Sequence, residues 1–171
     1  MTKKEFYNRI TNSSRDILAE FLKILNSKKI DYCAIGGIAV NAYCEPLITL
    51  DFDCVIAIKD INQLKKELKT AGFKIKTHPH TWEVKHRNSD IKIQLQRDKR
   101  YGDFIKRARI RNVLGYKIKV AKKEDVLKGK IWAYTDPERN KLKREKDALD
   151  IKRLIKKYPA LKRLVKNVDI R

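Results

Sequence analysis

The sequence predicts an α+β domain in which helices flank a mixed β-sheet and a basic helical part follows the sheet. Residues 91–96 alternate strictly between apolar and polar side chains, as a strand with one buried face does. The short apolar run 32–35 ends in Gly36-Gly37 and leads into a segment that fits a helix. The last 33 residues have helical spacing and hold 13 Lys and Arg against 4 Asp and Glu. Strands and helices in this irregular order are typical of α+β folds.

The chain has 171 residues, and 42 Lys and Arg against 21 Asp and Glu give it a net charge of +21. This length fits one domain with a buried core. We expect a cytoplasmic protein with no membrane partner, because no apolar run reaches the ~18 residues of a membrane span and the first residues do not resemble a signal peptide. Three cysteines without a CxxC spacing argue against a disulfide scaffold. The positive charge favours a phosphate-bearing partner, although a lysine-rich surface that only keeps the protein soluble has the same composition.

The first half of the chain alternates between helical and strand-like segments. Residues 3–28 fit one helix or a short helix followed by a longer one, with Asn12-Ser13-Ser14 as an N-cap inside the segment. A buried strand at 32–35 and a helix at 38–43 follow. The break at Glu45-Pro46 leads into a strand at 50–58, and a helix at 61–69 ends near Ala71-Gly72.

The second half holds three strand-like stretches and then mostly helices. The stretches are 73–77, 81–86 and 91–96, and a helix at 101–108 and a strand at 116–120 follow them. Helices are expected at 123–134, at about 140–157 and after Pro159. We therefore divide the chain into a core with its N-terminal helix, residues 1–120, and a helical C-terminal part packed on it, residues 121–171.

Two aspartates stand two positions apart on the strand predicted at 50–58. Asp51 and Asp53 therefore project from the same face of the sheet, while Phe52 points into the presumed core. Like charges side by side repel, and a divalent cation between them relieves the repulsion. The alternative is the solvated face of an edge strand. Apolar neighbours on both sides favour a central strand, and we interpret the pair as a metal site.

Gly36-Gly37 lies between a buried strand and the start of a helix. Glycine lets backbone N–H groups approach phosphates closely, and the helix N-terminus adds a favourable partial charge. A glycine pair also makes an ordinary tight turn. The position one helix before the paired aspartates favours phosphate binding.

Asp90 is the candidate third carboxylate. It has the parity of Lys92 and Gln94, opposite the apolar side chains of the same strand, and so faces the open side of the sheet. Three carboxylates there complete the two-metal site used in phosphoryl transfer. The alternative is a turn or N-cap aspartate in Asn88-Ser89-Asp90.

Taken in order, these residues resemble the nucleotidyltransferase superfamily, which shares the fold of DNA polymerase β, and within it the branch of AbiEii-type toxins and small uncharacterised relatives. That branch typically shows GG-x-A after a strand, then P-R-x-T-x-D-x-D, and downstream E-D-L-I-x-x-K and K-D-x-x-D-I. The corresponding segments are Gly36-Gly-Ile-Ala39, Pro46-Leu-Ile-Thr49-Leu-Asp51-Phe-Asp53, Glu124-Asp-Val-Leu-Lys-Gly-Lys130 and Lys146-Asp-Ala-Leu-Asp150-Ile151. The likeness spans roughly residues 30–155.

The resemblance implies Mg²⁺-dependent (or Mn²⁺-dependent) transfer of a nucleoside monophosphate from an NTP to an acceptor hydroxyl. It implies that the catalytic and metal-binding residues are Asp51, Asp53 and Asp90, with Asp90 activating the acceptor. The implied nucleotide-binding residues are Gly36, Gly37, Thr49 and Lys130. The basic C-terminal helices favour an RNA acceptor such as tRNA, a protein hydroxyl suits a toxin-like relative with a cognate antitoxin, and an aminoglycoside fits the fold but not the charge.

The sequence also departs from the pattern of the branch. The frequent Arg of the second motif is Leu47, and the third acid often lies within the strand, where this chain has Gln94. If Gln94 occupies that position, one metal site is lost. The competing hypothesis is therefore a non-catalytic nucleotide-binding or nucleic-acid-binding module with the same fold. Lys146 and Asp150 fit a surface ion pair as well as an active-site role.

Overall fold

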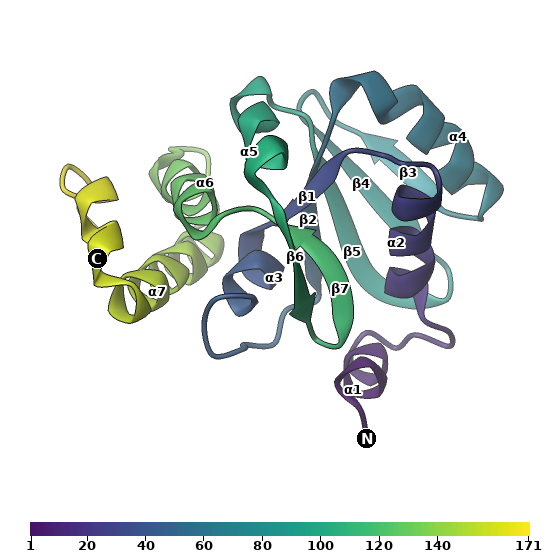
Figure 1. Cartoon of the computed structure of the whole chain (residues 1–171), viewed down its shortest axis with the longest axis horizontal. Helices are drawn as coiled ribbons and strands as arrows, with labels where there is room; N and C mark the ends of the chain where they lie inside the picture. The colour runs from purple at the N-terminus through teal and green to yellow at the C-terminus, as the bar shows by residue number, and fades with distance from the viewer.

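The computed structural model describes all 171 residues and shows a seven-stranded mixed sheet with helices on both faces (Figure 1). The strand order is β3-β4-β5-β2-β1-β7-β6. The pairs β1–β7 and β2–β5 are parallel and the other neighbours are antiparallel, which confirms the predicted mixed sheet. The strands are β1 (Tyr32–Ile35), β2 (Asp51–Ile56), β3 (Lys74–Thr77), β4 (Thr81–His86), β5 (Ser89–Gln96), β6 (Arg109–Val113) and β7 (Tyr116–Val120).

Helices α2 and α4 cover one face of the sheet, and α3, α6 and α7 lie on the other side (Figure 1). The α-helices are α1 (Lys3–Ile10), α2 (Ile17–Ser27), α3 (Gly36–Asn41), α4 (Ile61–Thr70), α5 (Gly102–Arg107), α6 (Lys123–Thr135) and α7 (Lys141–Lys157). Short 3₁₀ helices are η1 (Ile58–Asp60), η2 (Lys99–Tyr101) and η3 (Pro159–Leu164). The ring of Phe21 in α2 lies 5.9 Å from that of Phe52 in β2. Since side chains alternate along a strand, Asp51 and Asp53 face the side of α3, α6 and α7.

The N-terminal segment forms a short helix and a longer one, which confirms the second of the two predicted arrangements. The N-cap of α2 differs from the prediction: Asp16 accepts a hydrogen bond from the backbone N–H of Ala19 at 3.0 Å. The predicted cap residues instead fasten the start of β5, because Ser13 and Ser89 share a hydrogen bond of 2.6 Å between their hydroxyls.

Strand β6 is the element that the sequence pattern does not predict. Its first four residues are exposed, because β6 is the last strand of the sheet and pairs only with β7. A strand without a buried face has no reason to alternate between apolar and polar residues. The final predicted helix is the 3₁₀ helix η3, and β5 begins at Ser89, two residues before the predicted start.

Helices α6 and α7 pack against each other, and both contact α3. They form most of the segment 121–171, and the division of the chain at residue 120 stays a prediction. None of the helices combines the length and the apolar character that crossing a membrane requires.

Candidate active site

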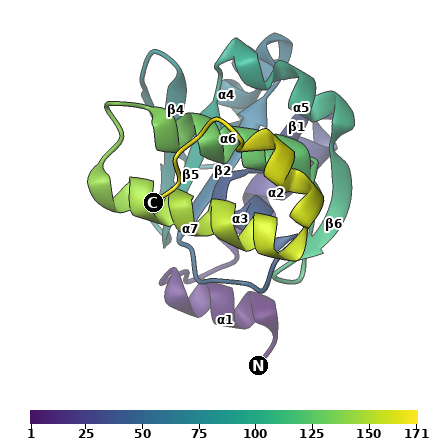
Figure 2. The same ribbon diagram turned by 90° about the vertical axis from the view of Figure 1, so that its left-hand side faces the viewer.

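A pocket of about 430 Å³ lies between β2 and the helices α3, α6 and α7. Figure 2 looks onto this side of the molecule, with α6 and α7 in front of β2 and α3. The volume falls within the ~300–1,000 Å³ of small-molecule sites. Its lining includes six of the seven predicted site residues: Gly36, Gly37, Thr49, Asp51, Asp53 and Lys130.

Asp51 and Asp53 both line the pocket from β2. Both are half-buried, and neither carboxylate has a hydrogen-bond or ion-pair partner within the protein. Burial raises the pKa of Asp53 to about 6; the charge of Lys130 opposes this rise, and that of Asp51 adds to it. Two acids without partners at the base of a pocket are a donor set for a cation.

The glycine pair packs directly against these acids. Gly36 begins α3 with a φ of +67°, and a Cβ at this position would collide with the carboxylate of Asp53. A Cβ at Gly37 would lie 3.4 Å from the Thr49 hydroxyl oxygen. Thr49 in turn accepts a hydrogen bond of 3.3 Å from the backbone N–H of Asp51. The backbone at 36–37, Thr49 and the paired acids therefore form one continuous surface.

Asp90 does not join the other two aspartates. The parallel register pairs Asp51 with Lys92 and Asp53 with Gln94. Asp90 therefore lies two residues before the partner of Asp51, at the N-terminal end of β5 and outside the pocket. Its exposed carboxylate accepts a hydrogen bond of 2.6 Å from the Asn12 amide. Gln94 lines the pocket beside Asp53. No three His, Cys, Asp or Glu side chains in the protein are grouped as metal ligands, so the predicted three-carboxylate cluster is absent.

Lys130 is buried in an ion-pair network between α6 and α7. Its ammonium donates to Asp147 at 3.0 Å and lies 2.8 Å from Asp150, two acids that are themselves buried. Burial alone lowers the pKa of Lys130, but the charges of Asp150 and Asp147 outweigh it and the net shift is upward. The sequence predicts that Lys130 binds phosphate. In the structure its positive charge is already paired with the carboxylates of Asp147 and Asp150.

Two arginines extend this network. Arg139 pairs with Asp147 at 2.9 Å, and Arg153 pairs with Asp150 at 2.7 Å. Arg153 also donates to the backbone carbonyl of Glu45, so α7 holds the loop between α3 and β2. The sequence pattern leaves Asp147 and Asp150 undecided between surface and site. Both acids pair with Lys130, which is 17 residues from Asp147 and 20 from Asp150, and only the packing of α6 on α7 reveals these pairs.

Unpaired cations complete the lining. Lys143 and Lys146 of α7 are exposed and line the pocket, and neither ammonium has an acid within 4.0 Å. Arg100 also lines the pocket, 5.0 Å from the ring of Trp132, but it is paired with Asp98 at 2.9 Å. The pocket therefore combines a small acidic floor with free positive charge at its edge, an arrangement that suits a phosphate chain bound through a cation.

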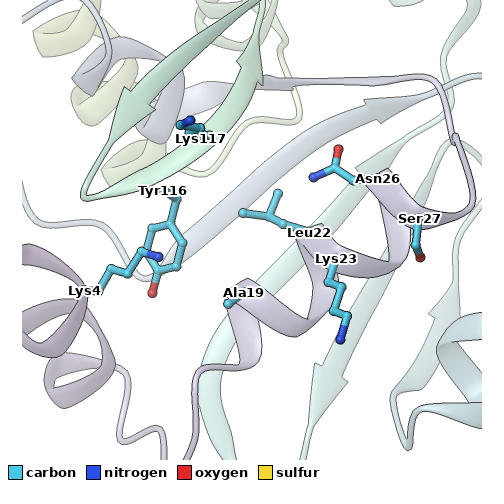
Figure 3. A pocket seen from close by; sticks show the side chains of 8 residues that line it. All are labelled: Lys4, Ala19, Leu22, Lys23, Asn26, Ser27, Tyr116 and Lys117. Atoms are coloured by element: carbon cyan, nitrogen blue, oxygen red, sulfur yellow. The ribbon is translucent and has the colours of Figure 1, made fainter.

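A second hollow, of about 370 Å³, lies between α1, α2 and β7. Figure 3 shows Leu22 and Asn26 pointing from α2 toward Tyr116 and Lys117. Its lining consists of Lys4, Ala19, Leu22, Lys23, Asn26, Ser27, Tyr116 and Lys117. Without a carboxylate it has no donor set for a cation, and the pocket at Asp51 is the better candidate for chemistry.

The fold of this chain is similar to that of solved nucleotidyltransferase structures. The chain aligns with the lincomycin-bound lincosamide antibiotic adenylyltransferase LnuA at a TM-score of 0.58 and 19% identity, over 84% of this chain and 97% of that one. The complex of ANT(2")-Ia with adenylyl-2"-tobramycin gives 0.64 and 13%, over 87% and 91%. An antigenic nucleotidyltransferase-like protein from Paracoccidioides brasiliensis gives 0.57 and 19%, over 98% and 90%. No protein-family model and no curated protein sequence matches the chain.

Because the identities are below 20%, these similarities establish the fold alone. The activity has to be argued from the residues of the site. The chain has a nucleotidyltransferase-like fold, as the resemblance implies. The AbiEii-type branch is not among these structures.

Proposed function

We propose that this chain is a nucleotidyltransferase that moves a nucleoside monophosphate from an NTP to an acceptor hydroxyl. The observation that carries the proposal is the pair of unpartnered carboxylates, Asp51 and Asp53, at the floor of a pocket with free lysines at its edge. A polyphosphate bound through a divalent cation needs both features. The proposal places the protein in the cytoplasm, where NTPs are available.

Asp51 and Asp53 would hold Mg²⁺ or Mn²⁺. Two carboxylates suit these cations, which favour oxygen ligands and accept further ones from substrate phosphates. A divalent cation bound there neutralises phosphate charge and orients the triphosphate. Asp90 is not one of the proposed metal ligands, because it lies outside the pocket.

The remaining site residues position the substrate. The backbone at Gly36 and Gly37 lies against Asp53 and Thr49 and offers the triphosphate a surface without side chains. Lys143 and Lys146 are free to pair with phosphates, whereas Lys130 holds α6 and α7 in place through its two carboxylates. The acceptor oxygen attacks the α-phosphorus in line, the bond to the bridging oxygen breaks, and pyrophosphate leaves while the proton of the hydroxyl passes to solvent water.

RNA, such as tRNA, and a protein hydroxyl are the two acceptors we propose. The net charge of +21 favours an anionic acceptor over a cationic aminoglycoside such as the tobramycin of the ANT(2")-Ia complex. The resemblance to AbiEii-type toxins supports a toxin-like role with a cognate antitoxin, and this branch assignment is part of the proposal.

A non-catalytic nucleotide-binding module is the second candidate. One observation favours it: Gln94, an amide, lies beside Asp53 on the neighbouring strand, where a third carboxylate would complete a two-metal site. Such a module binds NTP in the same pocket and forms no product.

A transfer assay separates these candidates. Each radiolabelled NTP is incubated with Mg²⁺, the protein, and either RNA or acceptor protein, and labelled acceptor and released pyrophosphate are measured. The proposal predicts both products with the wild type and with Asp90→Asn, and neither with Asp51→Asn. NTP binding without either product identifies the non-catalytic module.

A further inference from the structure

A surface with almost no negative charge lies beside the pocket. Residues 109–123 and 151–168 together contain 13 Lys and Arg and no Asp or Glu. These segments comprise the β6–β7 hairpin, the C-terminal half of α7 and η3. Only Lys123 and Arg153 of the 13 make ion pairs, with Glu124 and Asp150. Eleven cations in these segments therefore have no acidic partner in the protein. Two of them face away from the others, because Lys117 lines the hollow beside α2 and Lys119 lies 5.8 Å from the ring of Tyr32, so the basic surface is made by the remaining nine.

Two tyrosines join the segments in space. The guanidinium of Arg111 in β6 lies 4.3 Å from the ring centroid of Tyr43, and the rings of Tyr43 and Tyr158 are 6.3 Å apart. The ammonium groups of Lys123 and Lys157 lie 5.5 and 5.8 Å from the ring of Tyr158. In Figure 2, β6 and the C-terminal end of α7 both lie along the right-hand side. These contacts join Arg111 of β6 to the C-terminal end of α7, and the basic surface borders the pocket at Arg153.

The edge of the sheet belongs to the same surface. Strand β6 pairs only with β7, and residues 109–112 are exposed, so their outer backbone N–H and C=O groups are free for a ligand. Unlike side-chain ammonium groups, these groups both donate and accept hydrogen bonds, as a ribose 2′-hydroxyl does.

We propose that this basic surface binds RNA and guides it toward the pocket. Regularly spaced phosphates match a surface of unpaired cations, and protein–nucleic acid interfaces carry far more positive charge than protein–protein interfaces. An acidic protein partner needs apolar anchors as well, and Ile110 is the one large exposed hydrophobic residue in the two segments. The free edge of β6 favours RNA over DNA, because it can bind a 2′-hydroxyl, and on the proposed function the hydroxyls of RNA serve as acceptors.

The test compares two triple variants with equal loss of charge. Arg111→Gln/Lys122→Gln/Lys157→Gln removes three exposed, unpaired cations of the basic surface. Lys66→Gln/Lys69→Gln/Lys74→Gln removes three exposed cations from α4 and β3, at the other end of the sheet. Circular dichroism verifies the fold of both, and fluorescence anisotropy measures binding of a short labelled single-stranded RNA between about 50 and 200 mM salt.

We expect the first triple to raise the Kd for RNA about tenfold or more and to reduce the slope of log K against log salt by about 2. The second triple should change neither the Kd for RNA nor the slope against log salt by more than about twofold. Equal effects of the two triples would show attraction by net charge alone and overturn the proposal. Displacement of the RNA by polyglutamate at equal charge would assign the surface to an acidic protein, and equal binding of DNA of the same sequence would remove the preference for RNA.

The same variants keep this inference separate from the proposed function. Both triples leave the pocket intact, so the proposed function predicts unchanged Mg²⁺-dependent NTP binding for each. Loss of RNA binding with retained NTP binding supports the basic surface as a separate site. RNA binding by a protein that binds no NTP contradicts the proposed function and leaves the surface assigned to RNA.

Discussion

The negative charge of Asp53 destabilises the folded protein because of its surroundings. Its pKa rises to about 6 because the half-buried side chain is partly desolvated and lies near the charge of Asp51, so the folded state binds the proton more tightly than the unfolded chain. The cost is therefore absent below the unfolded pKa, grows as the pH rises toward 6 and is complete above it. A bound cation would remove this cost, which is consistent with a ligand site.

Asp53→Asn should stabilise the protein by about 1–3 kcal/mol above pH 6, because the amide carries no charge to bury. The gain should vanish below about pH 4. Urea unfolding of both proteins across this pH range measures it, with the exposed Asp90→Asn as a control that changes little. A variant that is less stable than the wild type at neutral pH would contradict the account.

Position 36 requires glycine because its φ is positive and because the carboxylate of Asp53 lies against it. Gly36→Ala should destabilise the protein by about 1–3 kcal/mol, since the positive φ strains alanine and the new Cβ meets the Asp53 carboxylate. Gly102→Ala is the matched control, because a Cβ at Gly102 meets nothing within 4 Å. Thermal unfolding compares the two, and equal melting temperatures would show that position 36 tolerates a side chain.

Among the secondary-structure elements, α6 and α7 are linked by a network of buried ion pairs. Lys130 shares two buried acids with Arg139 and Arg153, and Arg153 reaches the loop before β2. This network fixes the wall of the pocket that carries Lys143 and Lys146. The C-terminal helices therefore complete the site through positions on α7.

Lys130→Met should cost about 3–5 kcal/mol, because it leaves Asp147 and Asp150 buried with one cation fewer each. Lys128→Met, two residues away on the exposed side of α6, should change the free energy of unfolding by less than ~0.5 kcal/mol. Chemical denaturation measures both. Similar values for the two variants would mean that the ion pairs do not hold the helices together.

The strands and helices with a buried face could be predicted from the sequence, because burial imposes a period on them. Strands β4 and β7 match their predicted bounds. Strand β6 is not predicted, because most of its residues are exposed and burial imposes no period on them. The same-face pair Asp51 and Asp53 follows from strand parity alone. The place of Asp90 depends on the register between β2 and β5, which no local pattern contains.

At the scale of the whole molecule, the sheet separates two environments. One face packs apolar side chains against α2 and α4, and the other bears the pocket at Asp51 and Asp53. Much of the excess of positive charge lies in the β6–β7 hairpin and the C-terminal segment, and this segment reaches the pocket at Arg153. Positive charge of this density favours fast association with an anionic ligand at low salt.

The most direct test of the central claim is calorimetric titration of NTPs into the protein, with and without Mg²⁺. We expect Mg²⁺-dependent binding that Asp51→Asn weakens at least about tenfold and that Asp90→Asn leaves unchanged, because Asp51 lines the pocket and Asp90 lies outside it. Binding that needs Asp90, or that ignores both Mg²⁺ and Asp51, would contradict the assignment of this pocket as the nucleotide site.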